Sequence, residues 1–146
     1  MLPVSKPFLT ERKYDIYPSF KINDNQIFTG FETLAEKIQA YGKVTIDGYG
    51  GVFFDLFRIR LDNIFRKNGY NVSWINTDDL FKPEEQILEM TASFLGGNDP
   101  LFGKKTSLNL VDFFIAGKLK SASPDTVSDI NIIIGPGAAL AGWEGG

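Results

Sequence analysis

The amino-acid sequence predicts an α/β domain with a parallel sheet and flanking helices. Short β-rich runs alternate with stretches in which apolar residues recur every three or four positions, which is typical of strands joined by helical crossovers. The last β-rich run, residues 130–134, is almost continuously apolar, as expected for a strand covered on both faces. The chain of 146 residues is long enough for one hydrophobic core but short for two.

The boundaries of the predicted elements come from stop and start signals. Gly42 ends the first helical pattern, Asn68-Gly69 ends the second, and Pro83 followed by acids opens the third. Ser107 is a plausible cap for a fourth helix. In chain order we expect helices over 31–41, 53–67, 83–94 and 108–119, and strands over 43–47, 70–75 and 130–134.

The chain divides into a lead-in and a domain. Residues 1–29 read as an extended lead-in punctuated by prolines, in which short apolar pieces such as Tyr14–Tyr17 could dock on a surface. Residues 30–146 form the α/β domain. Because three strands alone leave a thin core and an uncovered sheet edge, we expect this domain to be truncated after the third strand and to continue beyond residue 146.

The charge balance and the apolar runs exclude two classes of partner. A net charge of −3 and a pI near 4.9 argue against a nucleic-acid binder, which would present a basic face. No run approaches a signal peptide or the length of a membrane span. We therefore expect a cytoplasmic protein with no nucleic-acid and no membrane partner.

Two missing residue types narrow the chemistry further. The sequence has no Cys and no His. It therefore cannot form a disulfide, a thiolate nucleophile, a Ser-His-Asp triad or a metal site built on Cys or imidazole. Carboxylates, Lys, Arg, Tyr, hydroxyls and backbone amides remain, and we expect no metal and no cofactor in this chain.

The glycine loop between the first strand and the second helix is the first candidate site. Strand, glycine turn and helix present backbone N–H groups to a phosphate, and the kinase form is G-x-x-x-x-G-K-[ST]. This pattern, started at Gly48, puts Phe53, Phe54 and Asp55 where the second glycine, the lysine and the hydroxyl residue belong. The relic of the loop is Gly48, Tyr49, Gly50, Gly51 and Asp55, which either still binds an anion or only permits a tight turn.

Asp78 and Asp79 form the second candidate site. They follow the second strand, and ligands of open α/β sheets bind beyond the carboxyl ends of strands. Such a pair can bind a metal, act as a base or simply cap a turn, and the sequence does not choose among these roles. The Asp99–Gly103 segment reads as a structured turn, and Trp143-Glu144 either lines a pocket or faces the core or a partner.

The series of motifs over about residues 43–143 resembles the uridine-kinase-like branch of P-loop kinases. The motifs that carry the resemblance are Gly48–Gly51, Asp78–Phe81, Asp99–Gly103 and Ile132–Gly137. It implies a three-layer sandwich in which Asp78 or Asp79 is the base that takes a proton from the substrate. In that branch an acid precedes the glycine after the third strand, but here Ile134 stands there. The glycine loop has lost its lysine and hydroxyl residues, and the third strand has lost its acid. These two losses imply a relic rather than a working kinase.

A second set of segments is similar to the N-terminal region of long bacterial mannose-6-phosphate isomerases of the cupin type. The segments are Tyr14–Pro18, Gly30–Leu34, Phe94–Gly103 and Gly137–Trp143. In that family a kinase-like domain precedes a zinc-dependent isomerase domain. The resemblance implies that this chain is a regulatory or scaffolding module, that the cupin domain is its partner, and that zinc belongs to that missing downstream domain, because this chain has no His.

Two alternatives stay open at the level of sequence. The chain could be a divergent small-molecule kinase, with Asp78 or Asp79 as base and Lys104 or Lys105 in place of the lost loop lysine. It could also be a purely structural α/β domain. If it binds a small molecule, we expect a sugar phosphate or, weakly, a nucleotide.

Overall fold

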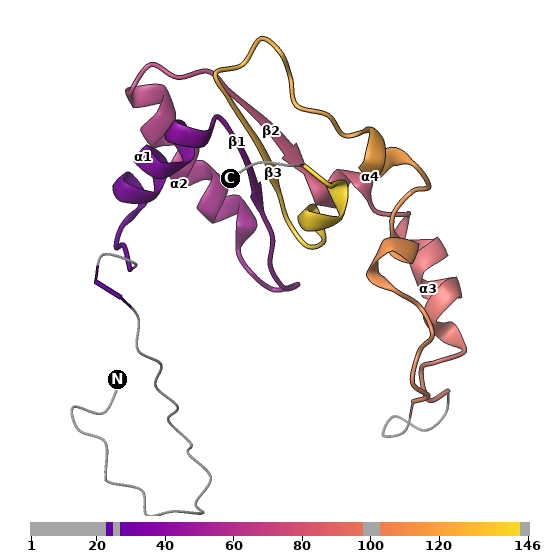
Figure 1. Cartoon of the computed structure of the whole chain (residues 1–146). Helices are drawn as coiled ribbons and strands as arrows, with labels where there is room; N and C mark the ends of the chain where they lie inside the picture. Colours follow the sequence, from indigo (N-terminus) through magenta and orange to yellow (C-terminus); the bar gives the residue numbers. More distant parts are fainter. Residues whose placement is uncertain (1–22, 25–26, 98–102, 144–146) are drawn as a thin grey trace, which may run out of the picture.

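The computed structural model describes residues 23–24, 27–97 and 103–143 (Figure 1). Most of the predicted lead-in, residues 99–102 of the predicted Asp99–Gly103 turn, and Glu144 lie outside the described residues. Within the part that is described, no helix has the length and apolar character needed to cross a membrane.

The prediction of an α/β fold is confirmed. The strands and the first three helices begin and end within a few residues of the predicted positions, because their apolar periodicity and stop signals are local. The strands are β1 (Lys43–Ile46), β2 (Val72–Asn76) and β3 (Ile130–Ile134); the α-helices are α1 (Phe31–Tyr41), α2 (Phe54–Lys67), α3 (Glu84–Ala92) and α4 (Lys118–Ser121); the 3-10 helices are η1 (Thr77–Leu80), η2 (Leu110–Phe113) and η3 (Ala138–Ala141).

The three strands form one parallel sheet in the order β1-β3-β2. The last of the described strands therefore lies in the centre. Ile132 is paired with Val44 on one side and with Trp74 on the other. All five residues of β3 are buried, whereas β1 and β2 are half-buried edge strands, which explains why β3 is the most nearly apolar of the three.

Helices α1 and α2 cover one face of the sheet (Figure 1). Alternate side chains of β3, among them Ile132, point to this face and pack against Ile38 of α1 and Leu61 and Phe65 of α2. Leu61, Phe65 and Ile132 are at most 1% exposed. Full burial of each such side chain stabilises the fold by roughly 1.5–3 kcal/mol, so this face holds the main core.

The opposite face is covered by short helical turns. Ile133 points to it and packs with Leu80 of η1, Phe114, Leu119 of α4 and Ala138 of η3. The sheet thus has a helical layer on each side, but the second layer is made of four-residue turns rather than long helices. Helix α3 contributes no buried residue and extends away from the body (Figure 1).

The predicted fourth helix over residues 108–119 is wrong. The 3-10 helix η2 starts after Asn109 rather than at Ser107, and the Asp112 carboxylate accepts a hydrogen bond from the Asn109 N–H at 2.7 Å. The chain then extends at Phe114, which forms a β-bridge with Phe81 and stacks on its ring with centroids 4.2 Å apart. Burial of Phe114, which is 3% exposed, overrides the local helical period.

Candidate functional site

The candidate residues lie at one edge of the sheet, where its three parallel strands end. The glycine loop follows β1, Asp78 and Asp79 lie in η1 directly after β2, and a second glycine turn, Gly135–Gly137, follows β3. Because β3 separates β1 from β2, the two predicted sites flank the second glycine turn instead of adjoining each other.

The glycine loop after β1 is open and exposed. Tyr49 is 87% exposed, and the Tyr49 carbonyl accepts a hydrogen bond from the Val52 N–H at 3.3 Å, which closes the turn. Gly51 has φ +96°, a backbone conformation that favours glycine. A Cβ at Gly50 or Gly51 would meet no described heavy atom within 4 Å. The loop therefore turns the chain, and no residue that the structure describes packs tightly against these two glycines.

The residues at the lysine and hydroxyl positions of the kinase pattern have other roles. Phe54, at the lysine position, is 9% exposed and belongs to the core; a Cβ at Gly48 would lie 3.1 Å from its Cζ. Asp55 is exposed in the first turn of α2, where its charge complements the helix dipole, and its Oδ1 lies 4.0 Å from Nη2 of Arg58. The start of α2 thus carries a hydrophobic side chain and a carboxylate, and neither attracts a phosphate.

Asp47 is a residue at the same edge of the sheet that the sequence analysis did not single out. It follows β1, and its Oδ1 accepts hydrogen bonds from the backbone N–H groups of Gly48 at 2.7 Å and Gly137 at 2.9 Å. Its Oδ2 accepts a third from the N–H of Ala139, also at 2.9 Å. The carboxylate therefore joins the loop after β1 to the start of η3. The available signal was an acid at the end of a strand directly before a glycine turn.

Asp78 and Asp79 are exposed residues of η1. The side chain of Asn76 caps this short helix by accepting a hydrogen bond from the Asp78 N–H at 3.1 Å, and Lys118 Nζ donates to the Asp79 carbonyl oxygen at 3.1 Å. Within the described ranges, no group of three or more His, Cys, Asp or Glu could hold a metal ion. The carboxylates of η1 are free to contact solvent, and their role stays a prediction.

The glycine turn after β3 is tightly packed. A Cβ at Gly135 would lie 2.1 Å from the Thr77 Oγ1, and one at Gly137 would lie 2.8 Å from the Phe114 Cζ. Thr77 is fully buried, and its hydroxyl has no hydrogen-bond partner among the described residues. Both glycines have positive φ, +126° and +77°. This turn therefore requires glycine both for its conformation and for the space.

The lysines proposed to replace the loop lysine lie elsewhere. The Lys104 N–H donates to the Phe94 carbonyl oxygen at 2.9 Å, which places this residue and its neighbour Lys105 near the end of the α3 arm. Figure 1 shows that end of α3 far from the glycine loop that connects β1 to α2. Lys118 is instead the lysine that contacts η1.

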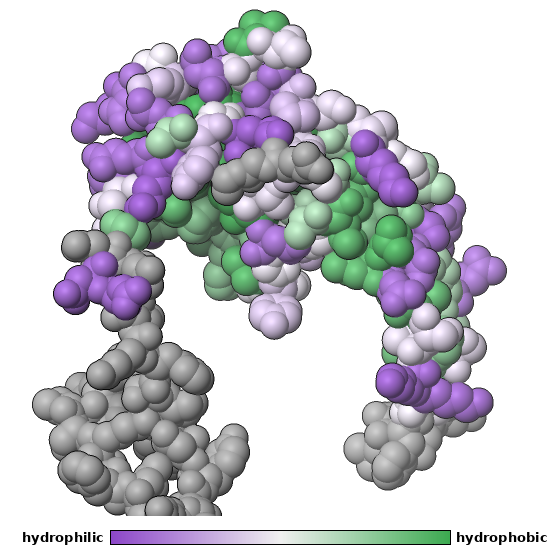
Figure 2. Space-filling model, viewed as in Figure 1, coloured by the Kyte–Doolittle hydropathy of each residue, from purple (hydrophilic) through white to green (hydrophobic). Residues whose placement is uncertain are grey.

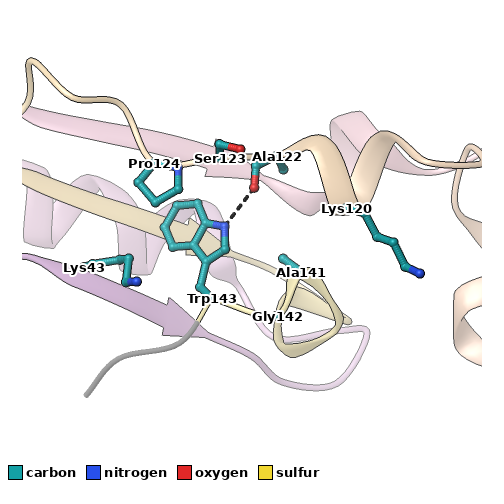
Figure 3. Close-up of a pocket in the computed structure, with 8 residues that line it drawn as sticks. All are labelled: Lys43, Lys120, Ala122, Ser123, Pro124, Ala141, Gly142 and Trp143. Carbon is teal, nitrogen blue, oxygen red and sulfur yellow. Dashed lines mark hydrogen bonds between the residues drawn. The ribbon is translucent and has the colours of Figure 1, made fainter.

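Trp143 lines a pocket of about 350 Å³ (Figure 3). Of the alternatives left open by the sequence, this is the one in which the tryptophan lines a pocket. The indole Nε1 donates to the Ala122 carbonyl oxygen at 2.8 Å, which fixes the ring, and Lys43 and Lys120 lie to either side of it. Ser123, Pro124, Ala141 and Gly142 complete the lining. The pocket has an aromatic face, and Lys43 and Lys120 are its two cationic lining residues; in Figure 3 the Lys120 ammonium group points away from the indole.

One carboxyl group outside this edge is held in its charged form. Burial tends to raise the pKa of Asp62, but hydrogen bonds from Arg66 Nε at 2.6 Å and Trp74 Nε1 at 2.9 Å, together with the charges of Arg66 and Arg58, hold that pKa below its usual value. Asp62 lies on α2 and Trp74 on β2, so this carboxylate ties the helix to the sheet.

Comparison with known proteins identifies the domain but gives it no activity. No curated protein and no solved structure matches the chain. One family model, described as a domain of unknown function (DUF8485), matches residues 30–145. The match covers most of the chain, including both glycine turns, η1 and the Trp143 pocket. The chain therefore belongs to the DUF8485 family.

Proposed function

We propose that this chain is a non-catalytic, P-loop-kinase-like module that regulates or scaffolds a sugar-phosphate isomerase, with mannose 6-phosphate as the expected substrate of the full protein. The observation that carries the non-catalytic part is the Asp47 carboxylate. It accepts hydrogen bonds from Gly48, Gly137 and Ala139 at the sheet edge where a kinase would bind phosphate. A phosphate entering there would meet a negative charge and amides that already have an acceptor.

The other lost features act in the same direction. A P-loop kinase needs a lysine for the phosphates and a hydroxyl for Mg²⁺. Here Phe54 faces the core and Asp55 adds a second negative charge. The link to an isomerase rests on the resemblance of the sequence motifs, and the tests below address what this chain itself binds.

The Trp143 pocket supports a role in sensing a sugar phosphate. The apolar face of a sugar ring can pack on an indole, and lysines bind phosphate as point charges. Lys43 and Lys120 flank the indole in a pocket of about 350 Å³, which is within the usual size range of small-ligand sites. The pocket thus offers the two kinds of contact that a sugar phosphate needs, and none of the described residues that line it is an acid.

Titration calorimetry tests both parts of the proposal. The chain is titrated with ATP, GTP, mannose 6-phosphate and fructose 6-phosphate, with and without Mg²⁺. We expect millimolar or weaker affinity for the nucleotides and tighter binding of a sugar phosphate. Nucleotide binding in the micromolar range with Mg²⁺ would overturn the non-catalytic assignment, and absence of binding by every compound would leave scaffolding as the function.

Intrinsic fluorescence locates the site. The sequence has two tryptophans, so a Trp74→Phe variant leaves Trp143 as the reporter. We expect a sugar phosphate to change the Trp143 emission, and a Lys43→Ala/Lys120→Ala variant to weaken binding at least tenfold. A matched Lys104→Ala/Lys105→Ala variant, with the same loss of charge on the α3 side of the molecule, should bind as the parent does.

A further inference from the structure

An apolar groove lies between the start of α1 and the start of α2. It has a volume of about 310 Å³, and its lining is Phe31, Val52, Phe53, Leu56, Phe57 and Arg60. Phe53 is 77% exposed, Leu56 59% and Val52 49%. In Figure 2 the lower side of the body, which includes the region under α2, carries much of the hydrophobic surface, whereas the upper side is mainly hydrophilic.

These exposed side chains are costly to leave in water. Full burial of a phenylalanine or leucine side chain is worth roughly 1.5–3 kcal/mol. Contiguous apolar patches on a protein surface usually mark an interaction site. Ile59 on the same helix and Ile27 and Phe28 before α1 are also about half exposed or more. We therefore expect a segment or a partner with apolar side chains to cover this groove.

The described chain enters the domain beside this groove. Phe28 lies against α1, with Lys37 Nζ 3.6 Å from the centre of its ring. Phe31, the first residue of α1, lines the groove and contacts the Phe57 ring at a centroid distance of 5.2 Å. The guanidinium carbon of Arg60 lies 5.3 Å from the Phe31 ring centre. The lead-in before residue 23 is thus connected to the groove by a few residues.

We propose that the segment Tyr14–Phe20 of the same chain docks in this groove. The segment offers four bulky apolar or aromatic side chains, Tyr14, Ile16, Tyr17 and Phe20. Its only charged residue is Asp15, which can pair with Arg60 at the groove. Pro18 favours extended backbone at Tyr17, and an extended segment can lie along a groove.

The connection is long enough and favours this occupant over a separate molecule. Ten residues separate Phe20 from Phe31, and the eleven steps between their Cα atoms span up to roughly 36 Å when extended, more than a return to the groove requires. A segment on a short tether has an effective concentration of order millimolar at its site. A second copy at micromolar concentration would have to bind about a thousandfold more tightly to compete.

Disulfide trapping tests the proposal directly, because the natural sequence has no cysteine. Ile16→Cys is combined with Leu56→Cys, which is at an exposed groove position. The control combines Ile16→Cys with Val127→Cys; Val127 is an 81% exposed apolar residue just before β3, at the opposite edge of the sheet. Under mild oxidation we expect the groove pair to form an intramolecular disulfide at least tenfold faster than the control pair.

The outcomes separate the possible occupants. Equal rates for the two pairs would overturn the proposal, and a disulfide-linked dimer formed by Leu56→Cys alone would assign the groove to a second copy. A Phe53→Ser substitution in the groove pair should slow trapping several-fold, since it removes apolar contact area at an exposed position and leaves the core intact. Circular dichroism of each variant confirms that the fold is retained.

Discussion

The two glycine turns at the carboxyl edge of the sheet differ in what they require of glycine. The turn after β1 is exposed, and side chains at Gly50 or Gly51 would meet no described neighbour. The turn after β3 has Gly135 against Thr77 and Gly137 against Phe114. The sequence pattern directs attention to the first turn, but the second is the one where backbone and side chains approach most closely.

This difference shows that glycine can be required in a loop for two separate physical reasons. Glycine can supply a backbone conformation, as Gly51 does with φ +96°, or it can supply space, as at Gly135. Asp47 links the two turns, since it begins the first and accepts hydrogen bonds from the second. Substitutions at these positions can separate the contributions of backbone conformation, of side-chain packing and of the Asp47 hydrogen bonds to stability.

The largest effect is expected for Gly135→Ala. The new Cβ would lie 2.1 Å from the Thr77 Oγ1, and the φ of +126° is unfavourable for alanine. Strain and overpacking together should lower the free energy of unfolding by about 3 kcal/mol. Urea unfolding followed by circular dichroism measures this. Adding Thr77→Ala should restore the packing part of the loss, and no restoration would show that the strain is entirely in the backbone.

Gly137→Ala should cost less, because its contact is with a side chain that can move. The Phe114 ring edge would lie 2.8 Å from the added Cβ, and φ is +77°. We expect a loss of about 2 kcal/mol in the free energy of unfolding. The matched variant is Gly51→Ala, which has a positive φ and no close neighbour and should lose about 1 kcal/mol. Equal losses would contradict the packing difference between the turns.

Asp47→Asn tests the link between the turns. The amide keeps one acceptor oxygen but loses the charge and presents an NH₂ group to an N–H donor. We expect a loss of about 1 kcal/mol, measured by the same urea unfolding, and faster hydrogen exchange at Gly137 and Ala139. Asp55→Asn removes an exposed carboxylate on the same side of the sheet and is the control. Unchanged exchange in the Asp47 variant would show that the carboxylate does not hold η3.

The smallest effect is expected for Gly50→Ala. A Cβ there has open space, so stability should change by no more than about 0.5 kcal/mol, and a small gain is possible because alanine restricts the unfolded chain. Thermal unfolding can detect a shift of this size. A loss comparable to that of Gly135→Ala would mean that the first turn is packed against something outside the described residues.

The sequence predicted the elements whose signals are local. Helix α2 shows why: its apolar residues repeat along one face and Asn68-Gly69 ends it, so neither its presence nor its end depends on distant contacts. The region 108–119 shows the opposite. Its helical period is real, but Phe114 gains more from burial against Phe81 and Ile133 than from a helical conformation. Such competition depends on partners far away in the sequence.

The location of the candidate residues could be predicted from the sequence, but their contacts could not. Loops after parallel strands gather at one edge in this fold class, and Gly48–Gly51 and Asp78–Asp79 do follow β1 and β2, while their role as a site stays a prediction. The contribution of Asp47 depends on the approach of η3, and the packing of Gly135 depends on Thr77. Both contacts require the strand order, which a single sequence does not reveal.

The central position of β3 has a consequence for how the domain forms. Among the described residues, β1 and β2 do not pair with each other, and each pairs only with β3, which follows both of them in the sequence. During synthesis β1 and β2 therefore stay unpaired until β3 has been made, while α1 and α2 can already pack against each other. Sheet formation then closes long segments of chain in one late step, which predicts slow folding compared with a helical domain of this size.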